Sequence, residues 1–481
     1  MVFSSINFIF VFLPLFLISY YLIDNKYKNI CILLYSIGFY AYGCIDNPYY
    51  VLILLVSLYV NFIFGLLIER NTRFCGFTLF VAVLFNVAIL FVFKYFDFVI
   101  DIIKYLNNNF EFRKLNLILP IGISFYTFQI LSYIFDVYYK KTVAEKNFIN
   151  LSTYIIMFPQ LIAGPILRYT DVKNDIDKDR IVGYKDLFVG IRVFIIGLAS
   201  KVIIANQLAG IQIDANVFEP SAISPATAWL ASIAYGLQLY FDFYGYSLMA
   251  IGLGKMIGVS IMKNFDEPFR AVTAGEFWRR WHISLGSWFK DYMLYPILMS
   301  KKMSKFKEII KKIFNNKNFA NFISNLIAMT LVWFTTGLWH GASMNYVLWG
   351  LYFLVFMIIE QMFLAKFIKK HNIFGHFYLI IIVIMSFTIF SNENLSALCI
   401  KLKKMWTFTS DFMDINCYNI FMTNLKAILL GILFATGLPQ YIYNKVKHIE
   451  VLDILLIASI FALSIFLIYK GYNDPFMYFR F

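Results

Sequence analysis

The sequence predicts an all-α protein that crosses a membrane about eleven or twelve times and carries additional re-entrant or interfacial helices. Of its 481 residues, 60% are hydrophobic and only 15% are charged, and the mean hydropathy is +0.70. The apolar residues form unbroken runs of roughly 20, the length that a helix needs to cross the hydrocarbon core. Strands of a membrane barrel would instead alternate apolar and polar residues over about ten positions.

The expected spans follow from these apolar runs, and the loops between them predict the topology. Candidate spans lie near residues 3–22, 30–46, 49–67, 75–98, 117–139, 187–210, 223–254, 319–340, 347–365, 376–391, 425–443 and 452–470. Basic loops at residues 24–29, 69–73, 140–146, 366–370 and 445–448 alternate with loops that are poorer in Lys and Arg. By the positive-inside rule, both termini lie outside the cytoplasm.

The N-terminus, the cysteines and the net charge exclude other classes of protein. Residues 1–23 lack the basic region and cleavage site of a signal peptide, so we expect a first spanning helix there. The five cysteines are scattered and show no metal-ligand spacing, which predicts neither a disulfide framework nor a metal site. The net charge of +14 resides mostly in loops between apolar runs, so nucleic-acid binding is not expected.

Residues 150–167 are apolar enough to span, but Pro159, Gly164 and Pro165 interrupt them. Counting this segment as a span would also place later loops on the wrong side of the membrane. We therefore expect a re-entrant or broken helix, which is tolerated where protein or a water-filled cavity covers the freed backbone groups.

The longest connection is strongly basic, with thirteen Lys or Arg and five Asp or Glu between residues 254 and 319. We expect residues 1–481 to form a single membrane domain in which residues 254–318 are a cytoplasmic loop containing interfacial helices. Residues 301–314 place apolar and Lys side chains on opposite helix faces, which predicts contact with anionic lipid headgroups. Holding a phosphate-rich molecule such as coenzyme A is the alternative.

His340 is the strongest candidate for chemistry, because it is one of only five histidines and lies inside the apolar segment 330–343. An ionisable side chain at membrane depth is costly and usually marks a site. Imidazole is also suited to proton transfer near neutral pH. From the spacing alone, a structural hydrogen-bonding histidine is equally compatible with the sequence.

A second candidate segment, residues 276–292, combines aromatic and basic residues around His282. Read as one helix, it aligns three tryptophans on one side, with Arg279 and Arg280 beside them. An interfacial helix with a tryptophan belt and snorkelling arginines is the competing interpretation.

Other polar residues give weaker signals. Asp242 lies among aromatic residues, so it must be paired or neutral, and it could pair with an Arg, line a cavity or act directly. Arg168 could hold phosphates or anchor at the interface. Gln129 and Asp136 are more typical of hydrogen bonds between helices. No chemistry is assigned to the remaining histidines, which are His371, His376 and His448.

Several segments, in order along the chain, resemble the membrane-bound O-acyltransferase family, and most closely its bacterial alginate O-acetyltransferase branch. Two are similar to the signature regions of that family: FWRRWHISL at residues 277–285 and GLWHGA at residues 337–342. Further similarity lies in LPIGISFYTFQ (119–129), FPQLIAGPILR (158–168), QLYFDFYGYS (238–247) and PFMYFRF (475–481). Tyr244 and Leu248 depart from the Ser and Asp usual in the family.

The resemblance implies a fold built around a central tunnel, with His340 as the catalytic residue and His282 as the second invariant polar position. In addition, we expect a set of residues to line the tunnel or the substrate path: Asp242, Trp281, Trp339 and Arg168. Arg279 and Arg280 are expected to bind the donor. His340 would take the proton from an acceptor hydroxyl, and His282 or a backbone N–H near Pro159 and Gly164 would stabilise the oxyanion.

The function implied is transfer of an acetyl group from a cytoplasmic thioester, with acetyl-CoA as the expected donor and no bound cofactor. The acceptor would be a hydroxyl of a cell-surface polysaccharide, or of an extracytoplasmic partner resembling SGNH hydrolases. The protein would then be a multi-pass protein of the bacterial inner membrane. A transporter for a polysaccharide or lipid-linked intermediate is the alternative, although we find no repeats between the two halves. A catalytically silent scaffold is a third.

Overall fold

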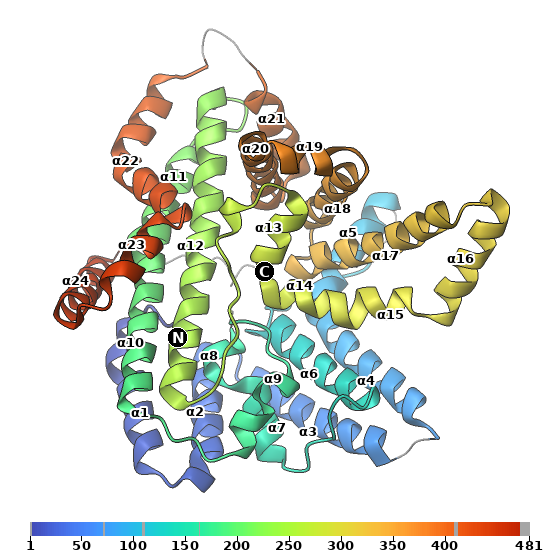
Figure 1. The fold of residues 1–481 in the computed structure, drawn as a ribbon, viewed down its shortest axis with the longest axis vertical. Helices are drawn as coiled ribbons and strands as arrows, with labels where there is room; N and C mark the ends of the chain where they lie inside the picture. The colour runs from blue at the N-terminus through green and yellow to red at the C-terminus, as the bar shows by residue number, and fades with distance from the viewer. Residues whose placement is uncertain (1, 71–72, 108–110, 163, 408–411, 472–481) are drawn as a thin grey trace.

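The computed structural model describes residues 2–70, 73–107, 111–162, 164–407 and 412–471, and these residues form helices and connecting segments without strands. Figure 1 shows the arrangement. The similar stretch at residues 475–481 and Ala163 lie outside the described residues. The helices of the first half are α1 (Leu13–Leu22), α2 (Lys28–Gly43), α3 (Tyr49–Arg70), α4 (Cys75–Leu90), α5 (Phe96–Leu106), α6 (Ile123–Tyr138), α7 (Phe148–Ile156), α8 (Phe158–Leu161), α9 (Tyr169–Asp177), α10 (Tyr184–Ala199), α11 (Asn206–Ala215) and α12 (Pro225–Ile257).

The second half continues the helical architecture. Its helices are α13 (Ala274–Arg280), α14 (Ile283–Phe289), α15 (Tyr295–Leu298), α16 (Lys301–Phe314), α17 (Lys317–His340), α18 (Met344–Ile359), α19 (Ala365–Lys370), α20 (Asn372–Ser391), α21 (Leu395–Met405), α22 (Ile415–Ala435), α23 (Leu438–Val446) and α24 (Glu450–Tyr469). Short π-helical segments join several of these, namely η1 (Phe8–Phe12), η3 (Phe91–Tyr95), η4 (Ser200–Ala205), η6 (Lys290–Leu294) and η7 (Glu360–Leu364). Two 3₁₀ turns are η2 (Asn25–Tyr27) and η5 (Pro268–Arg270).

The prediction of an all-α multi-pass protein is confirmed, although fewer helices than expected look like simple spans. Among the described residues, eight helices are long and apolar enough to cross a membrane by length and composition. Several other expected spans are shorter; α2 and α6 have 16 residues each. Fourteen of the 16 residues of α6 are buried in protein. A helix that packs against protein on all sides needs no lipid-facing apolar surface, so its sequence is more polar than that of a peripheral span.

The expected broken helix at residues 150–167 is confirmed. α7 ends at Ile156, Met157 adopts an extended ψ of 125°, and α8 has only four residues. Protein groups satisfy the freed backbone: the N–H of Phe158 donates to Ser36 Oγ at 3.0 Å, and the N–H of Ile166 donates to Ser284 Oγ at 3.0 Å. The second bond connects the break to α14, which follows His282.

Residues 276–292 do not form the single helix that the spacing suggested. The segment breaks at His282, whose φ of 45° lies in the left-handed region, so α13 and α14 are separate. Trp281 and Trp288 are buried, so the interpretation as a tryptophan belt at the membrane interface is wrong. The break turns this segment into the interior, where its aromatic side chains pack against α6 and α12.

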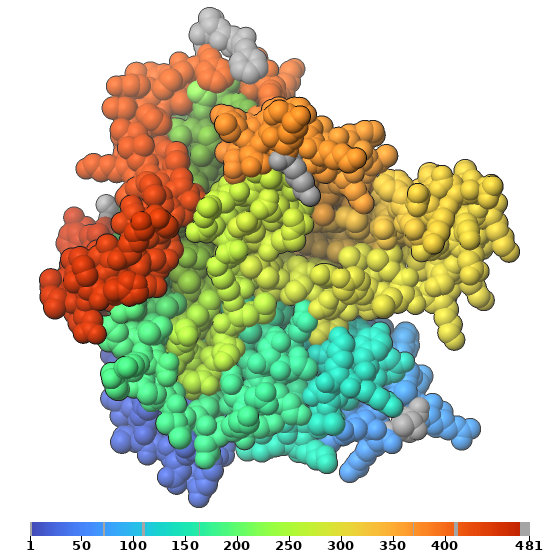
Figure 2. Space-filling view, in the orientation of Figure 1, coloured from blue at the N-terminus to red at the C-terminus, as the bar shows by residue number. Residues whose placement is uncertain are grey.

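By contrast, α16 matches its predicted amphipathic pattern. None of its residues is buried in the protein, and its apolar face includes Ile309 and Ile313, which are 54% and 67% exposed. Together with α15 and the start of α17 it forms an arm that projects from the rest of the molecule (Figures 1 and 2). Its predicted contact with lipid headgroups stays a prediction.

Candidate active site

His340 is the last residue of α17, and the antiparallel hairpin of α17 and α18 places it in the interior. The hairpin closes tightly because Gly337 faces the backbone of Tyr346, where a Cβ would lie 2.3 Å from the carbonyl oxygen. The His340 side chain is 4% exposed and packs between aromatic rings. Ring centroids lie 4.9 Å away for Trp349 and 5.3 Å away for Phe390.

Neither ring nitrogen of His340 has a hydrogen-bond partner among the described residues. Buried polar atoms in folded proteins are nearly always partnered, so an unpartnered imidazole needs an explanation. A structural histidine would be held by hydrogen bonds. The burial without partners therefore favours a nitrogen that meets a ligand over a structural hydrogen-bonding role.

His282 is also fully buried, but one side of its ring is held. Its Nδ1 lies 3.3 Å from Oδ1 of Asn264, and that same oxygen accepts from the N–H and hydroxyl of Ser284. Because an amide oxygen only accepts, Nδ1 carries the proton and Nε2 is the basic nitrogen. Nε2 has no partner among the described residues. Burial lowers the pKa of His282 to about 3, so its ring is neutral at physiological pH.

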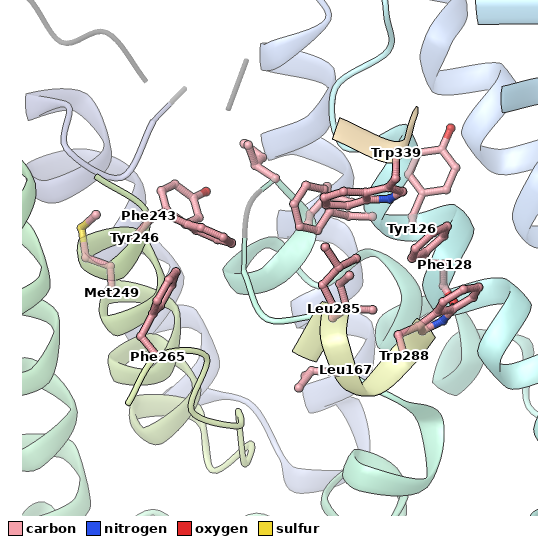
Figure 3. Close-up of a cluster of buried hydrophobic side chains, with 14 of the residues drawn as sticks. Tyr126, Phe128, Leu167, Phe243, Tyr246, Met249, Phe265, Leu285, Trp288 and Trp339 are labelled. Atoms are coloured by element: carbon pink, nitrogen blue, oxygen red, sulfur yellow. The ribbon is translucent and has the colours of Figure 1, made fainter. Parts of the chain in front are cut away.

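Trp339 brings the two histidines into one cluster. Its ring centroid lies 5.8 Å from that of His282 and 5.0 Å from that of His340. Figure 3 shows Trp339 beside Tyr126 and Phe128 of α6. We call His282, Trp339 and His340 the histidine cluster. The indole N–H groups of Trp339 and Trp349 are likewise buried without a partner among the described residues.

The other predicted site residues lie in several places. Asp242 pairs with Lys201 of η4 at 2.6 Å, and both side chains are 1% exposed, so this buried carboxylate is paired with a basic residue. Trp281 is buried against Tyr240 and Phe277.

The arginines are bound by carboxylates or lie at the surface. Arg168 pairs with Asp291 at 2.7 Å. Arg280 pairs with Glu276 at 3.0 Å, and Arg279 is exposed. These contacts do not bring Arg279 or Arg280 into the histidine cluster, and their predicted role at the donor stays a prediction.

Gln129 and Asp136, on α6, differ from each other. Asp136 accepts from the hydroxyl of Tyr292 at 2.8 Å, as expected for a residue that joins helices. The side-chain amide of Gln129 is buried with no partner among the described residues, so the expected hydrogen bond between helices is wrong for this residue. No group of three or more potential metal ligands occurs within the described ranges.

Comparison with known proteins assigns the family. A sequence model of the membrane-bound O-acyltransferase family matches residues 142–310. The chain is 35% identical to a probable alginate O-acetylase of Pseudomonas aeruginosa over 455 residues, covering 92% of this chain and 83% of that protein. It is 30% identical to a peptidoglycan O-acetyltransferase of Helicobacter pylori, covering 73% and 68%. The chain belongs to the membrane-bound O-acyltransferase family.

A third relative of this acyltransferase is a teichoic acid D-alanyltransferase of Bacillus subtilis, 31% identical over 53% of this chain and 62% of that protein. The predicted class of enzyme, an acyltransferase, is therefore confirmed, and so is its multi-pass membrane character. The alternative of a transporter is not supported. The predicted roles of individual site residues and the predicted tunnel stay predictions.

Sequence reasoning missed two residues of this acyltransferase that hold the end of α17. Lys94 of η3 donates to the carbonyl oxygen of Trp339 at 2.5 Å and to Ser124 Oγ at 3.3 Å. The hydroxyl of Tyr95 donates to the carbonyl oxygen of Leu338 at 2.9 Å. These bonds satisfy carbonyls that a helix end leaves free. The sequence does contain one signal for Lys94, because it is an ionisable residue inside the apolar span 75–98.

Proposed function

We propose that this protein transfers an acetyl group from a cytoplasmic thioester, acetyl-CoA, to a hydroxyl on the outer side of a bacterial inner membrane. The hydroxyl belongs to a cell-surface polysaccharide, or to an SGNH-hydrolase-like partner that serves it. The observation that carries the proposal is the histidine cluster, in which both ring nitrogens of His340 and Nε2 of His282 are buried without protein partners among the described residues. The relatives from Pseudomonas and Helicobacter, a probable alginate O-acetylase and a peptidoglycan O-acetyltransferase, support acetyl as the acyl group.

In the proposed reaction, His340 removes the proton from the acceptor hydroxyl as its oxygen attacks the thioester carbonyl. The new C–O bond gives a tetrahedral oxyanion; the C–S bond then breaks, and the leaving sulfur receives the proton from His340. Nε2 of His282 accepts a hydrogen bond from a bound substrate and helps to orient it. Proton transfer by a positioned histidine contributes roughly 10²–10⁴-fold to such rates.

The oxyanion needs a hydrogen-bond donor, and the described contacts narrow the candidates. Neutral His282 has a proton on Nδ1, which faces Asn264, so its Nε2 cannot donate. The backbone N–H groups of Phe158, Gly164 and Ile166 already have protein acceptors. The indole N–H groups beside His340 have none among the described residues, so we assign this role to Trp339 or Trp349.

Replacement of His340 tests the proposal. His340→Ala removes the proposed base and should lower acetyl transfer by about 10²-fold or more. His371→Ala alters an exposed histidine and should leave the activity unchanged. The assay measures transfer from labelled acetyl-CoA by purified protein in proteoliposomes, with size-exclusion profiles to establish that each variant is folded. Full activity in folded His340→Ala would overturn the assignment.

A further inference from the structure

A pocket of about 780 Å³ lies at the opposite end of α6 from the residues that touch the histidine cluster. It is formed where the end of α3, the start of α4, the end of α6 and α9 meet. The volume is in the range of small-molecule sites, about 300–1,000 Å³. We call this cavity the basic pocket.

The charges on its lining favour an anion. Lys140, Lys141 and Lys173 line the basic pocket together with one lining carboxylate, Glu69, and Lys141 also pairs with the buried Asp136 behind the lining at 3.4 Å. The Glu69 carboxylate already accepts from the backbone N–H of Ala144 at 3.3 Å. The ammonium of Lys140 has no ion-pair or hydrogen-bond partner among the described residues. Two threonines and an asparagine, Thr142, Thr170 and Asn174, add hydrogen-bonding groups to the lining.

The backbone at Lys140 is unusual for a lysine. Its φ of 57° is left-handed, at the end of α6, where the N–H of Lys141 returns to the carbonyl of Asp136 at 2.8 Å. Glycine or asparagine usually occupies this position, because a Cβ makes the conformation unfavourable. A strained non-glycine residue that lines a cavity suggests that its side chain is needed there.

The basic pocket lies on the side from which the proposed donor would arrive. The positive-inside pattern places the loops at residues 69–73 and 140–146 in the cytoplasm. From there, α6 leads inward to Phe128, whose ring centroid lies 5.6 Å from that of Trp339. From Phe128 to Tyr138, the last residue of α6, the helix runs for ten positions, which corresponds to about 15 Å, and Lys140 follows two residues later.

We propose that the basic pocket binds phosphate groups. This inference rests on the proposed function: the phosphates of coenzyme A would sit at the three lysines, while its extended arm carries the thioester towards the histidine cluster. The headgroup of an anionic phospholipid offers the same phosphate chemistry. Arg168, which pairs with Asp291, lies near one of these lysines, since Lys141 and Arg168 are 5.2 Å and 5.5 Å from the same ring, Tyr292.

Two acetyl donors separate the role of phosphate from the chemistry of transfer. The triple variant Lys140→Ala, Lys141→Ala, Lys173→Ala should raise the KM for acetyl-CoA by about tenfold or more, because charge-assisted hydrogen bonds are lost. The KM for S-acetylpantetheine, which has no phosphate, should stay the same, as should kcat for both donors. The matched control removes three exposed lysines of α16 by Lys302→Ala, Lys305→Ala and Lys311→Ala and should alter neither KM.

To distinguish a lipid headgroup from the donor phosphates, the KM values and lipid binding are measured in nanodiscs of neutral phosphatidylcholine and of anionic phosphatidylglycerol. An increase in KM for acetyl-CoA in both lipids supports the donor phosphates as the ligand. Loss of phosphatidylglycerol binding to the triple variant, with KM for both donors unchanged, supports the lipid headgroup. If neither KM nor lipid binding changes, the inference is overturned.

A binding measurement keeps this test separate from the proposed function. Adenosine 3′,5′-bisphosphate carries phosphates but no thioester, so its binding to purified protein requires no catalysis. His340→Ala should bind it like the unaltered chain, while the triple variant should bind it at least about tenfold more weakly if the donor phosphates are the ligand. Loss of activity in His340→Ala with retained binding separates the two sites. Equal binding by all variants, together with unchanged lipid binding, would exclude phosphate recognition at the basic pocket.

Discussion

Lys94 is an ionisable residue in an apolar helix, where such residues are costly and usually mark a functional site. It lies in the apolar helical stretch Cys75–Leu106, yet its ammonium reaches the last turn of α17. The π-helical segment η3 widens the helix at this point, and such segments recur at functional sites. We therefore regard Lys94 and Tyr95 as positioning residues that fix the end of α17 and, through it, the ring of His340.

The variant Lys94→Met tests this role, because methionine keeps the side-chain volume of lysine and removes the hydrogen-bond donor to the Trp339 carbonyl. The kcat should fall by about tenfold to a hundredfold, because small displacements of a reacting group are costly, while KM for the donor changes little. Lys94→Arg should restore much of kcat, and Lys104→Met on the adjoining α5 serves as the control. Kinetics in proteoliposomes measure both constants. An unchanged kcat in folded Lys94→Met would show that the hydrogen bond from Lys94 to the Trp339 carbonyl has no role in positioning His340.

The same residues show what the sequence could predict. His340 and His282 stand out because ionisable residues are rare in apolar segments and because their flanking strings are specific. Lys94 is also an ionisable residue in an apolar segment, but no specific string flanks it. Asn264 and Trp349 have neither of these features. Their roles come from contacts such as Lys94 with Trp339, 245 positions apart, which no local pattern encodes.

At the scale of helices, the α17 and α18 hairpin determines how deep His340 lies. A Cβ on Gly337 would lie 2.3 Å from the Tyr346 carbonyl oxygen, and a Cβ on Gly350 would lie 2.3 Å from that of Trp333. These contacts are backbone to backbone, so no side-chain rotation can relieve them. Close approach through small residues is typical of packed membrane helices. The break at His282 has a similar effect on the other histidine, because it turns α14 back towards α6, where Trp288 packs against Phe128.

Gly337→Ala tests the hairpin directly. The added methyl should force α17 and α18 apart, destabilise the protein by roughly 1–3 kcal/mol and reduce acetyl transfer. Gly38→Ala is the matched control, because nothing lies within 4 Å of a Cβ built there. Thermal unfolding in detergent and the acetyl-transfer assay would be compared for both variants. Equal stability and activity in Gly337→Ala would mean that the hairpin is looser than its geometry indicates.

The helical pattern also shows where sequence reasoning about elements fails. Period and hydropathy find α3 and α24, which face outward and must be apolar. They mark α12 less clearly, because its 33 residues include Asp242, which is buried in an ion pair with Lys201 of η4, and because most of them are enclosed by protein. Residues 276–292 fit a helical period, but the tertiary contacts of Asn264 and Ser284 favour a turn at His282.

For the whole molecule, the proposed function requires that the basic pocket and the outer end of α17 face opposite sides of the membrane. The positive-inside pattern places α16 with the basic pocket in the cytoplasm and residues 111–119 outside. Labelling with a membrane-impermeant maleimide can test this in a variant whose five cysteines are replaced. Lys114→Cys should be labelled in intact cells, whereas Lys307→Cys should be labelled only after permeabilisation; both side chains are exposed or partly exposed. The reverse pattern would place the histidine cluster near the cytoplasmic side, and transfer from a cytoplasmic donor to an outer hydroxyl would then be incompatible with the fold.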